Sequence, residues 1–210
     1  MAVIDMRDAN AFGDESQARV ISATLRCIAR WGLTKTTLDD VAREAGVSRA
    51  TVYRIVPGGK EGLMNLVAAA ELNRFFMSLD TAVKGLDNLE DTLVAAVVTA
   101  ARHLDEHGAL RFMLAHEPDL ILPRFAFTNL DLILSNVRVF AAPYVDQWLG
   151  HDAGAAAEWV ARIILSYVLT PSAEFNLADE QSARRLVRTY VLPGLTSSIK
   201  HYRNTVSHTA

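Results

Sequence analysis

One stretch, Thr36–Lys60, constrains the fold of this chain more than any other. Four apolar residues recur in its first half at i, i+3, i+4 and i+7, a spacing that predicts a short helix with one apolar face. They are Leu38, Val41, Ala42 and Ala45. Thr36 and Thr37 stand where a side-chain oxygen can cap the free backbone N–H groups of this helix. Asp39 and Asp40 fall in its first turn, where the helix dipole favours negative charge.

A turn and a second short helix follow. Gly46 has no Cβ and can adopt the left-handed conformation that ends a helix. Ser48 is expected to cap a helix from Arg49 to about Ile55, whose Val52 packs back on the first helix. The remaining side chains stay largely outside and are of types that meet bases and phosphates: Arg49, Ala50, Thr51, Tyr53 and Arg54. Together these elements form a helix-turn-helix.

Residues 19–63 resemble the DNA-binding domain of the TetR family of bacterial transcriptional repressors. The family pattern runs from an amphipathic helix ending in Gly, through a Thr-capped helix, to Gly-Val-Ser, Thr-x-Tyr and Lys-Glu-x-x-Leu. The matching residues here are Gly32, Thr36-Thr37, Val41-Ala42, Ala45-Gly46-Val47-Ser48, Thr51-Val52-Tyr53 and Lys60-Glu61-Gly62-Leu63. The chain departs from the pattern at Val56, where an aromatic residue is usual, and at Pro57-Gly58-Gly59, which lengthens the link to Lys60. Ile55 replaces a His or Tyr that often touches phosphate in the family.

The resemblance implies which residues of this chain contact DNA. Arg49 is suited to a bidentate contact with guanine, and Ala50 and the Thr51 methyl group are suited to thymine methyl groups. The complete predicted set is Thr36, Thr37, Ser48, Arg49, Ala50, Thr51, Tyr53, Arg54 and Lys60.

Other members of this set are expected to hold the DNA backbone. Arg54 and Lys60 are placed to anchor phosphates, as is Thr37 at the start of the preceding helix. For Tyr53 two interpretations stay open. Its hydroxyl contacts a phosphate or a base, or its ring packs against Leu63.

The distribution of charge agrees with a nucleic-acid partner. The whole chain carries a net charge of −3, yet residues 16–60 contain eight basic and three acidic side chains. The rest of the chain must therefore be strongly acidic. A basic N-terminal module on an acidic body is expected when one end of a protein meets DNA and the other does not.

The pattern along the chain predicts an all-α fold. Residues 1–14 lack periodicity and are expected to form a flexible arm. A helix from about Glu15 to Trp31 completes a three-helix DNA-binding domain, residues 15–62. Helical periodicity without strand-like alternation continues through a larger ligand-binding and dimerisation domain, residues 63–203. Residues 204–210 are expected to form a frayed tail.

Glycines and prolines divide the larger domain. A helix from Asp87 to His107 is expected to end at Gly108, and Pro118 is expected to stop the short helix that follows. Pro143 should kink or break a long helix that spans about 128–149.

The last two helices, about 155–170 and 179–202 with a kink at Pro193, carry a surplus of apolar residues. In the TetR family these helices pair with the same two helices of a second subunit, so the resemblance implies a homodimer. A twofold dimer also suits a pseudo-palindromic double-stranded DNA operator, because paired recognition helices must lie about 34–36 Å apart. The expected dimer interface comprises Trp159, Ile163, Tyr167, Leu186, Tyr190 and Leu195.

The resemblance also implies a small molecule among the central helices, whose binding moves the two DNA-binding domains out of register with the operator. The expected lining is Phe76, His103, Phe112, Met113, His116, Phe125, Phe127 and Asn129. Aromatic groups with few charges indicate a small hydrophobic effector, such as a lipid, an acyl chain or an aromatic drug. The alternative is a constitutive DNA-binding protein without an effector.

A catalytic pattern also occurs once. His103–His107 reads HLDEH and fits the H-x-x-E-H pattern of some zinc hydrolases. Only three residues are matched, so chance occurrences are common, and the pattern falls at a helix end. The sequence therefore predicts no metal, no cofactor and no enzyme, with a helical metal-dependent enzyme as the lesser alternative.

The remaining composition indicates a cytoplasmic protein. Cys27 is the single cysteine, so no internal disulfide can form, which suits a reducing compartment. No apolar run reaches the roughly 18 residues that a membrane-spanning helix requires. The N-terminal residues do not follow the signal-peptide pattern. We therefore expect no membrane partner.

Overall fold

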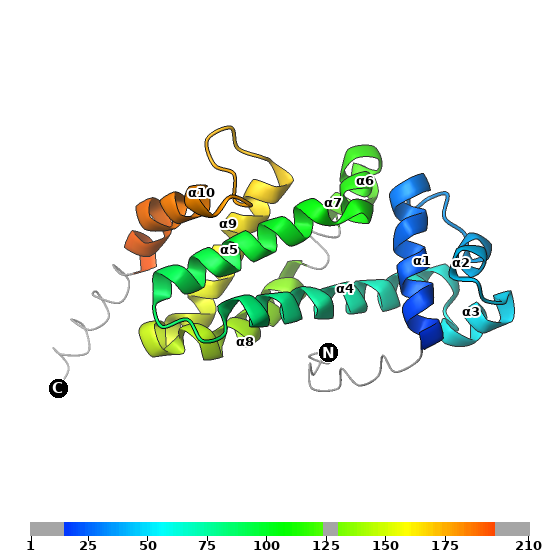
Figure 1. Ribbon diagram of the computed structural model, residues 1–210, viewed down its shortest axis with the longest axis horizontal. Coiled ribbons are helices and arrows are strands. Elements are labelled where there is room, and N and C mark those ends of the chain that lie inside the picture. The colour runs from blue at the N-terminus through cyan, green and yellow to red at the C-terminus, as the bar shows by residue number, and fades with distance from the viewer. Residues whose placement is uncertain (1–14, 124–129, 196–210) are drawn as a thin grey trace. The chain divides into compact units, whose positions relative to one another are not determined.

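The computed structural model describes residues 15–123 and 130–195, and every regular element in these ranges is helical, as predicted. The predicted arm and tail lie outside them. No helix within these ranges is long and apolar enough to cross a membrane. The elements (Figure 1) are α1 Glu15–Trp31, α2 Leu38–Ala45, α3 Arg49–Ile55, α4 Gly59–Val83, α5 Leu89–Glu106, α6 Gly108–His116, α7 Pro118–Pro123, α8 Leu130–Leu149, η3 Gly150–Asp152, α9 Ala153–Leu169, α10 Glu180–Leu186 and η4 Val187–Val191.

The chain divides into two compact units. The described part of unit 1 comprises residues 15–77 and 106–123, and that of unit 2 comprises residues 78–105 and 130–195. Helices α6 and α7 thus belong to the same unit as α1, α2 and α3, because α6 packs against α1. The grouping follows this contact between distant segments and not the order of the chain.

Unit 1 is built around the packing of α1, α2 and α3. Val20, Val41 and Val52, one from each helix, are completely buried, and Leu63 from α4 joins the same core. Burying an aliphatic side chain of this size contributes about 1.5–3 kcal/mol. Gly32 ends α1 with a φ of 85°, as the sequence predicts. The two short helices, α2 and α3, therefore depend on this shared core for stability.

Two residues that were expected to end helices also begin the next ones. The helices do end close by, α5 at Glu106 and α6 at His116. Gly108 is the first residue of α6. Pro118 is the first residue of α7, where the N–H that proline lacks would have no partner inside the helix.

Pro143 does not break α8. The helix continues from Leu130 to Leu149 with Pro143 inside it. Pro143 and Val139, four residues earlier, are both exposed, so the carbonyl that loses its intrahelical partner can bond to water. The helix is therefore not broken after Ala142, and the alternative of a kink at Pro143 stays a prediction.

Unit 2 contains the packed pair α8 and α9. Leu134, Val145 and Leu149 of α8 are buried, as are Val160 and Ile164 of α9. The core of this unit is mostly aliphatic, in agreement with the apolar patterning of the sequence.

Charged groups join α10 to the start of α5 in the same unit. Arg184 lies 2.9 Å from Glu90 and 2.5 Å from Asp91, and Arg188 lies 2.7 Å from Glu90. The hydrogen bond from Arg188, helped by Arg184, holds the pKa of Glu90 below its ordinary value. Glu90 therefore stays ionised between two guanidinium groups.

The last helical segment changes its winding before Pro193. α10 is followed by a single π-turn, η4, in which the N–H of Leu192 bonds to the carbonyl of Val187. α-Helical geometry returns at residues 192–195. Proline has no N–H to donate, and the irregularity lies just ahead of it. The sequence did not predict this π-turn, and the kink at Pro193 stays a prediction.

Candidate nucleic-acid interface

The first helix of the helix-turn-helix, α2, is capped by Thr37. The Thr37 hydroxyl accepts the N–H of Asp40 at 3.2 Å and donates to the Asp40 carboxylate at 2.5 Å. The carboxylate also accepts the N–H of Thr37 at 3.2 Å, which completes a capping box. Chiefly through the Thr37 hydroxyl, these bonds lower the pKa of Asp40. The N-cap predicted from the threonine pair is thus Thr37.

The turn between α2 and α3 has the predicted geometry. Gly46 has a φ of 64°, in the left-handed region where a Cβ is disfavoured. The N–H of Val47 bonds back to the carbonyl of Ala42 at 3.0 Å. Ser48 then caps α3, because its Oγ accepts the N–H of Thr51 at 3.0 Å. These bonds fix the angle at which α3 leaves α2.

The outer face of α3 is the candidate base-reading surface. Val52 is completely buried, whereas the next residue, Tyr53, keeps 48% of its surface exposed. Arg49, Ala50 and Arg54 are exposed as well. An α-helix fits the major groove of DNA, and α3 presents its polar face outward. Tyr53 is thus about half exposed, so its hydroxyl is accessible and both interpretations of this residue stay open.

Arg49 is tied to α2 by an ion pair that sequence reasoning did not identify. Its Nε lies 2.6 Å from Oδ1 of Asp39. The sequence assigned Asp39 only to the helix dipole. The Arg49 side chain remains mostly exposed in this pair, and the contact is an ion pair without hydrogen-bond geometry. Asp39 therefore orients the first side chain of the recognition helix.

The loop between α1 and α2 uses two of the predicted DNA-contact residues internally. Thr36 is only 2% exposed, and its hydroxyl donates to the carbonyl of Gly32 at 2.6 Å. Because Thr36 closes this turn, it offers no surface hydroxyl to DNA. Lys60, from the start of α4, is exposed and donates to the carbonyl of Thr34 at 3.1 Å. Its ammonium group is thus held beside the loop.

Glu117, between α6 and α7, completes this loop from a distant part of the chain. Its carboxylate accepts the N–H groups of Leu33 at 2.5 Å and Thr34 at 2.9 Å. A Cβ on Gly32 would lie 2.9 Å from the carboxylate, so any other residue would displace Glu117 and strain the backbone at a φ of 85°. Burial alone would raise the pKa of Glu117, but these hydrogen bonds and the charge of Lys60 lower it overall. No local sequence pattern could have revealed this contact.

The departure from the family pattern at Val56 has a packing explanation. Val56 is buried in the core of unit 1. A Cβ on Gly62 would lie 3.2 Å from Cγ1 of Val56, closer than ordinary contact. The missing side chain of Gly62 therefore leaves the room that Val56 fills.

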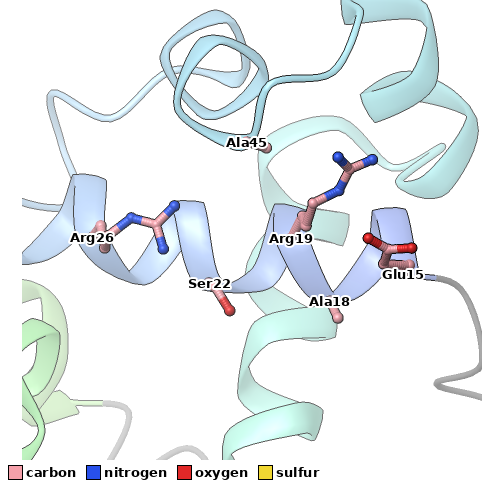
Figure 2. A pocket seen from close by; sticks show the side chains of 6 residues that line it. All are labelled: Glu15, Ala18, Arg19, Ser22, Arg26 and Ala45. Carbon is pink, nitrogen blue, oxygen red and sulfur yellow. The ribbon is translucent and has the colours of Figure 1, made fainter.

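An open pocket on α1 contains two more basic residues (Figure 2). Arg26 is engaged by Glu44 of α2 at 2.7 Å, whereas Arg19 is exposed. The pocket has a volume of about 370 Å³ and is lined by Glu15, Ala18, Arg19, Ser22, Arg26 and Ala45. Arg19 thus adds an exposed cation to the basic module, although the predicted site did not include it.

The residues predicted to line an effector site do not all fall in one unit. Phe76, Phe112, Met113 and His116 belong to unit 1, and His103 belongs to unit 2. Within unit 1, the rings of Phe112 and His116 stack with their centroids 4.3 Å apart. Three further residues, Phe125, Phe127 and Asn129, lie outside the described residues.

The residues predicted to form a dimer interface lie in unit 2 and differ in exposure. Trp159 and Tyr190 are 40% and 59% exposed. A Cβ on Gly194 would lie 3.0 Å from the Trp159 ring, so the indole rests on this glycine. Leu186 and Leu195 are buried within their own chain. These two leucines therefore serve the core of the unit and leave Trp159 and Tyr190 on its surface.

The H-x-x-E-H pattern has a structural use at His107. Its Nδ1 accepts the N–H of Leu110 at 3.1 Å and so caps α6. Its Nε2, which then carries the proton, lies 3.0 Å from the carboxylate of Glu71. Both ring nitrogens are engaged, so His107 has no lone pair directed at a metal. The described residues include no group of three or more metal-ligating side chains.

Comparison with known proteins agrees with this geometry. Residues 20–67 match the family model described as bacterial regulatory proteins, tetR family. The uncharacterized HTH-type transcriptional regulator YfiR of Bacillus subtilis is 32% identical over 133 residues, which cover 54% of this chain and 63% of that protein. The present chain thus spans less than two thirds of this curated relative.

Solved structures show the same fold. The TetR family repressor AlkX from Dietzia aligns with a TM-score of 0.63 and 21% identity, over 83% of this chain and 97% of AlkX. The fatty acid degradation regulator FadR from Bacillus halodurans aligns with a TM-score of 0.59 and 16% identity, over 84% of this chain and 96% of FadR.

The all-helical fold and the capped helix-turn-helix with an exposed second helix define the class of a helix-turn-helix DNA-binding module. The family match itself covers the helix-turn-helix part of the chain, which resembles the TetR family of bacterial regulatory proteins. The proteins to which it is similar are regulators and not enzymes, in agreement with the sequence prediction.

Proposed function

We propose that this regulator is a cytoplasmic repressor that binds a pseudo-palindromic DNA operator as a homodimer and is released by a small hydrophobic effector. The observation that carries the proposal is the separation of roles on α3. Val52 is wholly buried and anchors the helix, while Arg49 and Tyr53 are exposed beside it. Such a helix can enter the major groove without disturbing the core.

We assign base recognition to the first turns of α3. Arg49, oriented by Asp39, is suited to guanine, and Ala50 and Thr51 are suited to thymine methyl groups. Tyr53 lies further along the same exposed helix and is suited to a phosphate or a base.

Phosphate contacts are assigned to groups around α3. Thr37 caps α2 at its N-terminus, where backbone N–H groups favour an anion. Arg54 and Lys60 are exposed cations on α3 and α4. Contacts of this kind hold the protein in register on DNA without reading its sequence.

The homodimer is supported by exposed aromatic groups in unit 2. Tyr190 and Trp159 are large apolar side chains left on the surface, and such residues are enriched at interfaces. Tyr190 and Tyr167 both lie edge-on to Phe175, with centroids 6.0 and 6.2 Å apart. This cluster holds the rings in fixed orientations, which lowers the entropy cost of association.

The hydrophobic effector is supported by the composition of the interior. Among the residues described as buried, aliphatic and aromatic side chains dominate, and Thr24, Thr36, Thr92 and Asn136 are the only polar ones. Two of the structural neighbours are named for n-alkane and fatty acid degradation. The proposal for this chain is consistent with those names and rests on its own apolar core.

The test is fluorescence anisotropy with DNA from the upstream region of the gene and a scrambled duplex, across a range of salt concentrations. We expect tighter binding to the upstream duplex and a linear fall of log affinity with log salt. No binding at low salt would contradict the DNA-binding assignment. Equal binding to both duplexes would contradict an operator in that region.

A thermal-shift screen separates this proposal from the constitutive alternative. An effector at 100 times its dissociation constant should stabilise the protein by about 2.7 kcal/mol. Compounds that stabilise the protein should also release it from the operator. A hydrophobic library without any such compound would favour a constitutive DNA-binding protein.

A further inference from the structure

One buried side chain in unit 2 lacks the hydrogen bonds that its environment should supply. Asn136 on α8 is 6% exposed, and its Nδ2 has no hydrogen-bond partner. The other buried polar side chains of the described residues, Thr24, Thr36 and Thr92, each donate to a backbone carbonyl. An unpaired buried amide destabilises a fold, and native proteins retain few of them. The exception at Asn136 therefore indicates a role outside the folded chain.

Asn136 shares one side of α8 with two aromatic residues. Asn136, Phe140 and Tyr144 follow at i, i+4 and i+8, which places them in one row along the helix. The rings of Phe140 and Tyr144 lie 5.2 Å apart, and the Tyr144 hydroxyl donates to Asp80 of α4. This row, the α8 stripe, is thus turned towards α4 and extends for about 12 Å at 1.5 Å per residue.

We propose that the α8 stripe is a contact surface for the effector, with the Asn136 amide donating to a neutral hydrogen-bond acceptor on an otherwise apolar molecule. The ligand class is a medium-length ketone, ester or amide. This inference rests on the proposed effector-controlled function and specifies the chemistry of its site.

The charges near the stripe favour a neutral acceptor over a carboxylate. Asn136 supplies an N–H but no positive charge, and a buried anion requires a cationic partner. Arg138, two residues further along α8, is exposed and paired with Glu158 at 3.1 Å. At the other end of the stripe, the carboxylate of Asp80 would repel a second anion.

The unpaired amide also provides a means of distinguishing carbonyl compounds from alkanes. An alkane in contact with the stripe would leave the Asn136 N–H unsatisfied, whereas a carbonyl would pair with it. Sites built to bond a polar group reject analogues that lack it. Phe140, in the middle of the stripe, supplies an apolar surface for the body of the molecule.

The test compares the wild type with Asn136→Leu, using 2-undecanone, undecane and undecanoate as probes. We expect 2-undecanone to stabilise the wild type most and to release it from operator DNA. Asn136→Leu should melt several degrees higher than the wild type without a ligand, because an unpaired amide is replaced by an apolar group of similar size. It should also bind 2-undecanone at least tenfold more weakly.

Ser135→Ala, on an exposed position of the same helix, is the control and should behave as the wild type. A lower melting temperature for unliganded Asn136→Leu would overturn the inference, since the amide would then be satisfied in solution. An equal response of both proteins to 2-undecanone would overturn the role of Asn136 and leave effector-controlled release intact.

The proposed ligand class would be overturned if undecane or undecanoate stabilised the wild type more than 2-undecanone does. It would also be overturned if none of the three probes stabilised the protein. Failure of the wild type to bind operator DNA without a probe would instead contradict the proposed function.

Discussion

Glu117→Ala should reveal how much the contact from the α6–α7 junction to the loop between α1 and α2 stabilises the fold. The change removes two charge-assisted hydrogen bonds, to Leu33 at 2.5 Å and to Thr34 at 2.9 Å. Such bonds contribute about 1.5–3 kcal/mol each. Thr34 is exposed, so water replaces most of its bond. We therefore expect a loss of about 2 kcal/mol in the free energy of unfolding.

The assay is thermal unfolding at pH 7. For a protein of this size, about 2 kcal/mol corresponds to a decrease in Tm of roughly 4–8 °C. Glu117→Gln keeps one acceptor oxygen without the charge and should lose roughly half as much stability. The matched control is Glu106→Gln, at an exposed acid of the same unit, which should change the free energy of unfolding by less than about 0.5 kcal/mol.

The pH dependence supplies the decisive outcome. The pKa of Glu117 is lowered in the folded protein, so its contribution is complete above the ordinary glutamate pKa of about 4.3 and is lost as the pH falls through the folded value. The stability difference between the wild type and Glu117→Ala should thus shrink below about pH 4. An undiminished difference in urea unfolding at pH 3, or none at pH 7, would refute the assignment.

Four further substitutions test other parts of the structure. Arg49→Ala should lower the preference for operator over scrambled DNA by about 1–3 kcal/mol, and equal losses of affinity on both duplexes would contradict base reading. Lys60→Ala should instead weaken binding to both duplexes and reduce the slope of log affinity against log salt by about 1. Gly32→Ala should lower the free energy of unfolding by more than about 1 kcal/mol, because the φ of Gly32 is 85° and Glu117 occupies the place of a Cβ. An unchanged urea midpoint of unfolding would contradict this expectation. Tyr190→Glu should shift the protein towards monomers in sedimentation, and an unchanged dimer would exclude that surface.

The parts of the site that depend on neighbouring residues were predictable from the sequence. Thr37, Gly46 and Ser48 act through bonds to residues within five positions of themselves. Capping and left-handed turns follow rules of this short range. The exposed face of α3 follows from the same logic, because Val52 alone carries the inward position.

The contacts that could not be predicted join distant segments. Glu117 reaches back to Leu33, 84 positions away. The pair between Asp39 and Arg49 depends on how α2 and α3 cross, which residue spacing does not specify. Asn136 reads as an ordinary polar residue in the sequence, and only its burial without a partner makes it unusual.

The π-turn η4 makes the length of the last helix as important as its composition. A turn of this kind accommodates one extra residue, and each residue of an α-helix advances the side-chain direction by about 100°. Deleting one residue between Val187 and Val191 would therefore restore regular α-helical winding, while Leu195 stays in the core and Gly194 stays against the ring of Trp159. Inserting one residue there would instead turn Leu195 out of the core and bring a larger side chain to the indole. The segment can thus lose one residue, but not gain one, without changing the surface around Trp159.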